Sequence, residues 1–135
     1  MTQIFCAVSA GVLVASIGFV STAQAPQLPT TFTNLQVLPK DIAQRPLIDL
    51  MRSFAQGLGV RCEHCHVGEG NDLSKFDFAA DTKPTKATAR KMLKMMFAIN
   101  DDLLTGVGDP APAGTRKVTC FTCHRGELKP LTSKG

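Results

Sequence analysis

Apolar residues recur at helical spacing in two separate stretches of the chain. The first stretch predicts a helix from about residue 46 to residue 58, because its apolar positions lie three or four residues apart. These positions are Leu47, Leu50, Met51, Phe54 and Leu58. Pro46 suits the first turn of that helix, where a missing N–H costs no hydrogen bond. Gly57 and Gly59 are stop signals at its other end.

The second stretch predicts a longer helix, which Pro84 opens and which runs to about Leu104. One stripe of this helix carries Thr88, Met92, Met95, Met96, Ile99 and Leu103. Residues 106–114 include three glycines and two prolines, which end the helix in a loop. Residues 31–38 alternate only weakly between polar and apolar, which indicates at most a short extended segment. The pattern therefore predicts a mainly α fold with two main helices, long loops and little sheet.

The N-terminal stretch has the features of a targeting segment. Residues 4–20 are almost wholly apolar or small, and Ala23-Gln24-Ala25 supplies an Ala-x-Ala cleavage signal. We therefore expect residues 1–25 to be a secretory signal peptide and residues 26–135 to be one mature domain. No Lys or Arg precedes the apolar run, so the alternative is an uncleaved anchor. The run has 17 residues, the lower edge of the length that spans a bilayer.

Each predicted helix is followed by a Cys-x-x-Cys-His motif, the signature of covalent c-type haem attachment. The motifs are Cys62-Glu63-His64-Cys65-His66 and Cys120-Phe121-Thr122-Cys123-His124. Two thiols three positions apart can each add to one haem vinyl group. The following His is then placed under the porphyrin, where its imidazole can bind iron. The sequence thus predicts two covalently bound haem c groups around which the small domain is organised.

Three other interpretations of the cysteine pairs are weaker. A Cys₄ zinc site normally has about 15–20 residues between its pairs, whereas 54 residues separate Cys65 from Cys120. Zinc also gives no reason for a His directly after each pair. A pair of structural disulfides would suit an oxidising compartment. A thioredoxin-like redox motif would need a βαβ pattern, which the chain lacks.

Composition supports a cofactor-filled core. The chain has 135 residues, enough for one domain, with no Trp, no Tyr and only eight Phe. Large apolar side chains are therefore scarce, and two haems would serve as apolar core material. The fifth cysteine, Cys6, lies in the N-terminal segment, so the mature domain has no cysteine outside the two motifs.

The chain has a net charge of +4. Five of its basic residues cluster in one segment, directly before and along the second predicted helix. The members of this cluster are Lys83, Lys86, Arg90, Lys91 and Lys94. We favour a solvated helix face for this cluster; the alternative is a docking patch that speeds encounter with an acidic redox partner. No nucleic-acid-binding motif and no interleaved aromatic residues accompany the cluster. We expect neither nucleic acid nor a small-molecule substrate as partner.

The second axial ligand of each haem iron is predicted to be methionine. The chain has three histidines. Two of them, His66 and His124, are the expected proximal ligands, and His64 lies inside a Cys-x-x-Cys turn, where it is poorly placed to reach the opposite haem face. Bis-His ligation of both haems is therefore impossible. The methionines ahead of the motifs are Met51, Met92, Met95 and Met96; the alternative role for each is packing in irregular gaps.

Several stretches together resemble one dihaem half of the tetrahaem cytochrome c subunit of photosynthetic reaction centres. The resemblance runs from Phe32 to Pro130. It rests on Asn34-Leu35-Gln36-Val37-Leu38, on Met51 ahead of the first motif, on residues 89–95 with Ile99-Asn100, and on residues 118–126. The resemblance implies a mostly helical, haem-centred fold in which Met51 and Met92 are the axial ligands. Met95, one turn from Met92, is the rival to Met92.

This chain departs from the family pattern in two ways. It has one half of the four-haem subunit, and it lacks the His that in the family lies between the second helix and the second motif and ligates a haem of the other half. The loss of this His is consistent with a stand-alone dihaem protein and counts against a reaction-centre role.

We accordingly expect a periplasmic or otherwise extracytoplasmic electron carrier, soluble or membrane-associated, and not an enzyme. Its partners would be redox proteins, acidic or membrane-bound. One alternative is a redox subunit docked to a membrane complex such as a photosynthetic reaction centre. A less favoured alternative is a small haem peroxidase-type enzyme with His64 as its only available base.

The first prediction concerns stoichiometry. The mature protein should carry two covalent haems, one through Cys62 and Cys65 and one through Cys120 and Cys123, because each motif supplies two thiols and a ligand. Intact mass should exceed the polypeptide mass by two haems. Removal of haem by acid–acetone extraction, or tightly bound zinc, would contradict this prediction.

Overall fold

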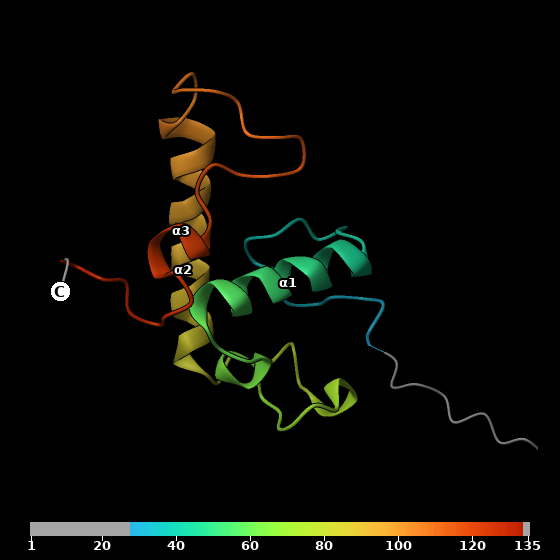
Figure 1. The fold of residues 1–135 in the computed structure, drawn as a ribbon. Helices are drawn as coiled ribbons and strands as arrows, with labels where there is room; N and C mark the ends of the chain where they lie inside the picture. Colours follow the sequence, from blue (N-terminus) through green and yellow to red (C-terminus); the bar gives the residue numbers. More distant parts are fainter. Residues whose placement is uncertain (1–27, 134–135) are drawn as a thin grey trace, which may run out of the picture.

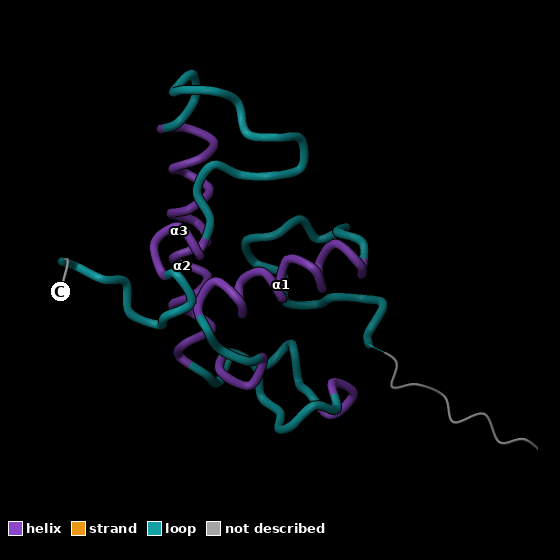
Figure 2. Tube along the Cα trace, viewed as in Figure 1, coloured by secondary structure: helices purple, strands orange, loops and turns teal. Residues whose placement is uncertain are grey.

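The computed structural model describes residues 28–133, and in that part of the chain it is mainly helical (Figure 1). The elements are α1 (Gln44–Leu58), η1 (Cys62–His64), η2 (Leu73–Lys75), α2 (Pro84–Ala98), η3 (Ile99–Leu103) and α3 (Cys120–His124). Within residues 28–133 there is no strand, and extended pairing is limited to one isolated bridge between Val67 and Asp77. The expected fold class, with two longer helices, long loops and little sheet, is confirmed (Figure 2).

Helix α1 begins at Gln44, two residues before the expected start, and ends where the glycine signal predicts. Gly59 adopts the left-handed conformation with φ 63°, and its N–H points back to the carbonyls of Ala55 and Gln56. This is the usual glycine end of a helix, which satisfies carbonyls that the last turn leaves free. The chain then turns directly into the first cysteine motif.

Helix α2 begins at Pro84 as predicted, but its last part is not α-helical. Residues Ile99–Leu103 form a π-helical segment, in which the Leu104 N–H donates to the Ile99 carbonyl at 2.9 Å, five residues back. The helical stretch therefore reaches the predicted end near Leu104 with a widened final turn. Such π segments are rare.

A small apolar core joins α1, α2 and the segment that precedes α1. Its buried members are Leu38, Leu47, Leu93 and Met96. Residues 31–38, where a short extended segment was possible, form no strand but contribute Leu38 to this core. Apart from these four, Phe76 is the only large hydrophobic side chain that is buried among residues 28–133. The polypeptide therefore supplies little core of its own, as the shortage of large side chains predicts.

Only part of the apolar stripe predicted for α2 faces the core. The core contacts come from Leu93 and Met96, whereas Met92 and Met95 are 47% and 52% exposed. Leu103 is also exposed. The difference has a simple cause: Leu38 and Leu47 pack on the side of α2 that carries Leu93. Helical spacing identified the helix but did not decide which edge of its apolar stripe meets the core.

The end of α1 contacts the second cysteine motif backbone to backbone. A Cβ atom added at Gly57 would lie 2.9 Å from both the Cβ of Cys120 and the N of Phe121. One added at Gly59 would lie 1.9 Å from the carbonyl oxygen of Gly126. The Gly126 N–H donates to the Gly57 carbonyl at 3.0 Å. The two glycines therefore allow α3 to sit directly on the end of α1.

None of the helices described between residues 28 and 133 combines the length and the apolar character needed to cross a membrane. The predicted signal peptide, residues 1–25, lies outside the described residues.

The contact between α1 and the second motif predicts unequal effects of two alanine substitutions. Gly59→Ala should cost about 1–2 kcal/mol for the left-handed backbone and about 1–3 kcal/mol more for overpacking against Gly126. Gly106→Ala is the control, because Gly106 has φ 75° but no atom within 4 Å of an added Cβ. It should incur only the first cost. Denaturant unfolding of both variants measures the difference; equal losses would contradict the contact.

Candidate functional site

The two cysteine motifs lie on short helical turns. Cys62 and Cys65 bracket η1, with Cys62 exposed and Cys65 half-buried, and Cys120 and Cys123 lie on α3. Burial raises the pKa of the Cys65 and Cys120 thiols, which favours their neutral form. In the described part of the chain no three His, Cys, Asp or Glu side chains converge as ligands for one metal ion.

Side chains at the start of α2 donate hydrogen bonds to backbone carbonyls of the first motif. The Thr85 hydroxyl donates to the His64 carbonyl at 2.6 Å, and the Lys83 ammonium donates to the Glu63 carbonyl. These carbonyls belong to the turn between Cys62 and Cys65. The turn is therefore fixed by side chains that follow it by about 20 residues in sequence.

His66, the predicted proximal ligand of the first motif, lies against one aromatic ring, which in turn stacks on a second. Its imidazole meets the Phe78 ring edge to face, with centroids 5.1 Å apart, and Phe78 stacks on Phe76 at 5.5 Å. Burial, aided by the positive charges of Lys86 and Arg90, lowers the pKa of His66. The neutral imidazole that results is the form that binds metals. Its Nδ1 is buried and has no hydrogen-bond partner.

Lys86 anchors the loop that carries those rings. Its ammonium donates to the carbonyls of Phe78, Ala79 and Ala80 at 3.0, 3.2 and 2.7 Å and pairs with Asp81 at 3.0 Å. The residue is only 8% exposed. Four acceptors around one ammonium compensate for its loss of hydration. The loop is thereby held beside His66.

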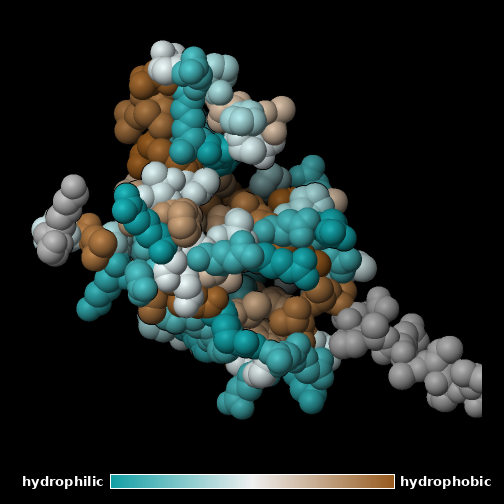
Figure 3. All heavy atoms as spheres, in the orientation of Figure 1, coloured by the Kyte–Doolittle hydropathy of each residue, from teal (hydrophilic) through white to brown (hydrophobic). Residues whose placement is uncertain are grey.

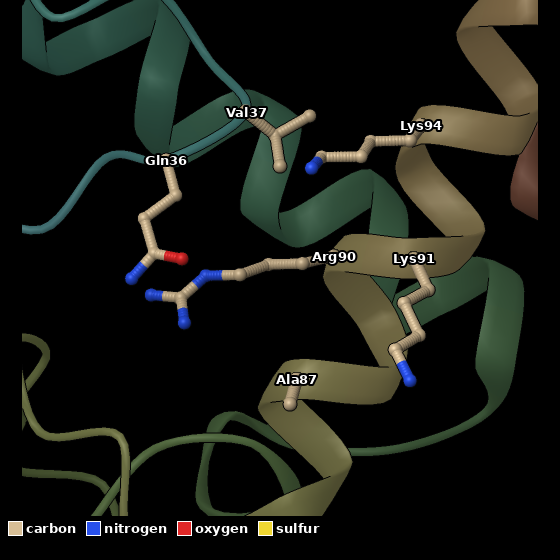
Figure 4. Close-up of a pocket in the computed structure, with 6 residues that line it drawn as sticks. All are labelled: Gln36, Val37, Ala87, Arg90, Lys91 and Lys94. Atoms are coloured by element: carbon tan, nitrogen blue, oxygen red, sulfur yellow. The ribbon is translucent and has the colours of Figure 1, made fainter.

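The interpretation of the basic cluster as a wholly solvated face is wrong for three members. Lys83 is half-buried and donates to the Glu63 carbonyl. Lys86 is buried, and Arg90 pairs with Asp81 at 2.9 Å with most of its side chain covered. The acidic partner lies in a loop outside the helix, so helical charge spacing gave no signal of the pairing. Lys91 and Lys94 are exposed as predicted. They line a hollow of about 230 Å³. Figure 4 shows Lys94 extending toward Val37.

The second motif is ordered by its own end caps. Thr119 and Thr122 form a reciprocal capping box at the start of α3. The Nδ1 of His124 lies 3.0 Å from the Glu127 carbonyl, so it donates its proton there and leaves Nε2 free as a ligand atom. Arg125, which follows, is exposed and has φ 53°.

The candidate methionine ligands have different surroundings. Met51 is half-buried on α1 and packs against the core. Met92 and Met95 are exposed on α2, and Met96 is buried in the core. Met96 is therefore a packing residue. Met92 and Met95 both remain accessible, so the structure leaves the choice between them open.

The surroundings of the two motifs fit a large apolar group. At the first, His66 offers a neutral imidazole with an unpartnered buried nitrogen. At the second, Phe121 within the motif is exposed, as are Met92 and Met95 on the preceding helix. Figure 3 shows apolar residues gathered at the upper end of the column that α2 and η3 form, above the second motif. An exposed apolar area of this kind normally marks a binding surface. The residues present therefore suit haem.

Comparison with known proteins gives a consistent result. Residues 6–133 match the family model described as the photosynthetic reaction centre cytochrome C subunit. The photosynthetic reaction center cytochrome c subunits of Rubrivivax gelatinosus and Roseobacter denitrificans are 35% and 36% identical to this chain over 89 and 101 residues. These matches cover 61% and 73% of this chain.

A protein named cytochrome c-554, from Chloroflexus aurantiacus, is 32% identical over 99 residues, or 73% of this chain. The matches cover 23%, 25% and 21% of the three relatives, in the order given. The chain thus spans about a quarter of the length of the curated relatives it matches.

The Lys86–Asp81–Arg90 cluster predicts a defined pH dependence. Arg90 and Lys86 hold the pKa of Asp81 well below its usual value of 3.8. The pairing therefore stabilises the fold fully above that value and is lost as pH falls below it. Asp81→Asn should lower the melting temperature at pH 7 and flatten the decline below about pH 4. The exposed Asp109→Asn is the control and should leave the decline unchanged. An equally steep decline in Asp81→Asn would contradict the assignment.

Proposed function

Because the chain belongs to the photosynthetic reaction centre cytochrome c subunit family, we propose that it is a periplasmic electron carrier with two covalent haem c groups. One observation carries the proposal: each of two Cys-x-x-Cys-His turns follows a helix that bears an accessible or half-buried methionine. The family consists of cytochrome electron carriers and not of enzymes. The proposal includes export and cleavage after Ala25, with residues 26–135 as the mature dihaem domain.

Each haem would supply a one-electron ferric–ferrous couple when bound. We assign Cys62 and Cys65 to thioether attachment of the first haem and His66 to its iron. Cys120, Cys123 and His124 have the same roles at the second. His124 is oriented for this task by its hydrogen bond to the Glu127 carbonyl. The chain's contribution is to orient the ligands and to set the charge and polarity around them.

Met51 and Met92 complete the proposed ligand sets. Met51 lies on α1 ahead of the first motif, and Met92 lies on the exposed side of α2 ahead of the second. A His–Met pair raises the reduction potential relative to a pair of histidines. The family resemblance supports Met92 over Met95, which is exposed to a similar extent.

The proposed partners are redox proteins. Relatives of this chain are named as reaction-centre subunits, which favours docking to a membrane complex as a second candidate role. The chain is also similar to a protein named as a cytochrome and not as a reaction-centre subunit, which favours an independent carrier instead. Lys91 and Lys94, both exposed, would attract an acidic partner. Co-sedimentation of the purified protein with reaction-centre membranes separates the two roles.

The ligand assignment predicts selective effects of three alanine variants. Met51→Ala and Met92→Ala should each leave both haems attached, convert one haem to high-spin or water ligation and lower its potential, because a thioether ligand is lost. Met95→Ala removes an exposed side chain and should leave both irons low-spin. Visible and EPR spectra with a redox titration provide the measurement.

Met95→Ala is also the decisive control for the second haem. If that variant lost the Met–iron absorption band while Met92→Ala retained it, the second ligand would be Met95. If neither variant affected the band, methionine ligation of the second haem would be wrong.

A further inference from the structure

The side chain of Asn100 joins the end of α2 to the chain that enters the second cysteine motif. Its Nδ2 donates to the carbonyls of Met96 and Val118, both at 2.8 Å. The Val118 N–H donates to its Oδ1 at 3.0 Å. Both amide protons and the amide oxygen are therefore used. Since Val118 offers one donor and one acceptor, its two groups also fix which way the Asn100 amide points.

This arrangement holds Val118 as a neighbouring β-strand would, through both its N–H and its carbonyl. No strand lies beside Val118 in the described part of the chain, so the side chain takes the place of a backbone partner. Asn100 lies in the π-helical segment Ile99–Leu103. Segments of this kind occur frequently at functional sites.

Val118 lies two residues before Cys120 and directly before the capping residue Thr119. Helix α3 has only five residues, too few to be stable without tertiary contacts. Its far end is held by the hydrogen bond from Gly126 to the Gly57 carbonyl. Its near end is reached through the loop that follows η3. The Asn100 hydrogen bonds connect the end of this loop, at Val118, to the η3 segment.

A second contact near this point is weaker. Arg116 pairs with Asp101 at 2.6 Å, but both side chains are substantially exposed. Exposed ion pairs contribute little to stability, whereas the Asn100 bonds are partly buried. The amide is therefore the stronger of these two polar contacts, and it acts beside the packing of Cys120 against Gly57 and the core.

We propose that Asn100 is a positioning residue for the second haem: it sets the register of Cys120, Cys123 and His124 by fixing Val118. The proposal rests on the proposed dihaem function. The first motif has a separate holder, the Thr85 hydroxyl on the His64 carbonyl. Loss of Asn100 should therefore disturb the second haem and leave the first unchanged.

The test uses the full mature holoprotein with Asn100→Leu, which removes all three bonds, and Asn100→Asp, which keeps only the acceptor. Thr85→Val is the matched control at the first motif, and Asp102→Asn is an exposed control in the same turn. Amide hydrogen exchange at Val118 should accelerate up to about tenfold in Asn100→Leu, the effect of losing one net hydrogen bond. NMR and EPR spectra, with haems assigned through their cysteines, report each iron separately.

We expect both Asn100 variants to shift the potential and the low-spin signal of the haem on Cys120 and Cys123, with the other haem unchanged. Thr85→Val should show the reverse, and Asp102→Asn neither effect. Unchanged signals at both haems, or equal changes at both, would overturn the proposal. If Asn100→Leu does not accumulate, Asn100→Asp decides by the same criteria. Mass of the unmodified protein separately tests the dihaem function, since fewer than two haems would refute that function itself.

Discussion

The structure depends above all on the direct backbone contact between the end of α1 and the second cysteine motif. Gly57 and Gly59 lack the Cβ atoms that would collide with Cys120, Phe121 and Gly126. Because α1 leads straight into the first motif, this contact also fixes where the two motifs lie relative to each other. Two segments about 60 residues apart in sequence thus become one unit, although few apolar side chains are buried.

Helix α2 organises the same two motifs from the other side. Its first turns supply Thr85 and Lys86, which hold the first motif and the loop beside His66. Its last turn is followed by Asn100, which holds the approach to the second. The two imidazoles nevertheless have different surroundings: His66 lies against the Phe78 ring near two cations, and His124 donates to a backbone carbonyl. One helix therefore supports two sites of unequal character.

Local patterns in the sequence account for much of this arrangement. Periodicity placed both helices, glycine spacing placed the end of α1, and the cysteine spacing identified the motifs. The burial of Lys86 was missed because its partners are loop carbonyls and Asp81, which no helical spacing reveals. The sequence also did not show that α2 contacts the core through Leu93 and not through Met92. This packing depends on Leu38, which comes from a segment without regular structure. Tertiary partners from loops thus limited what the sequence could show.

The sparse core has a consequence for how such a protein matures. A chain that buries so few apolar side chains and exposes Met92, Met95 and Phe121 gains little free energy from folding alone. Before cofactor attachment, the chain would unfold often, and proteases would cleave the unfolded form. Thioether bonds, once formed, do not dissociate under these conditions, so haem attachment would be irreversible. Proteolysis would then remove molecules without haem faster than molecules to which haem is attached.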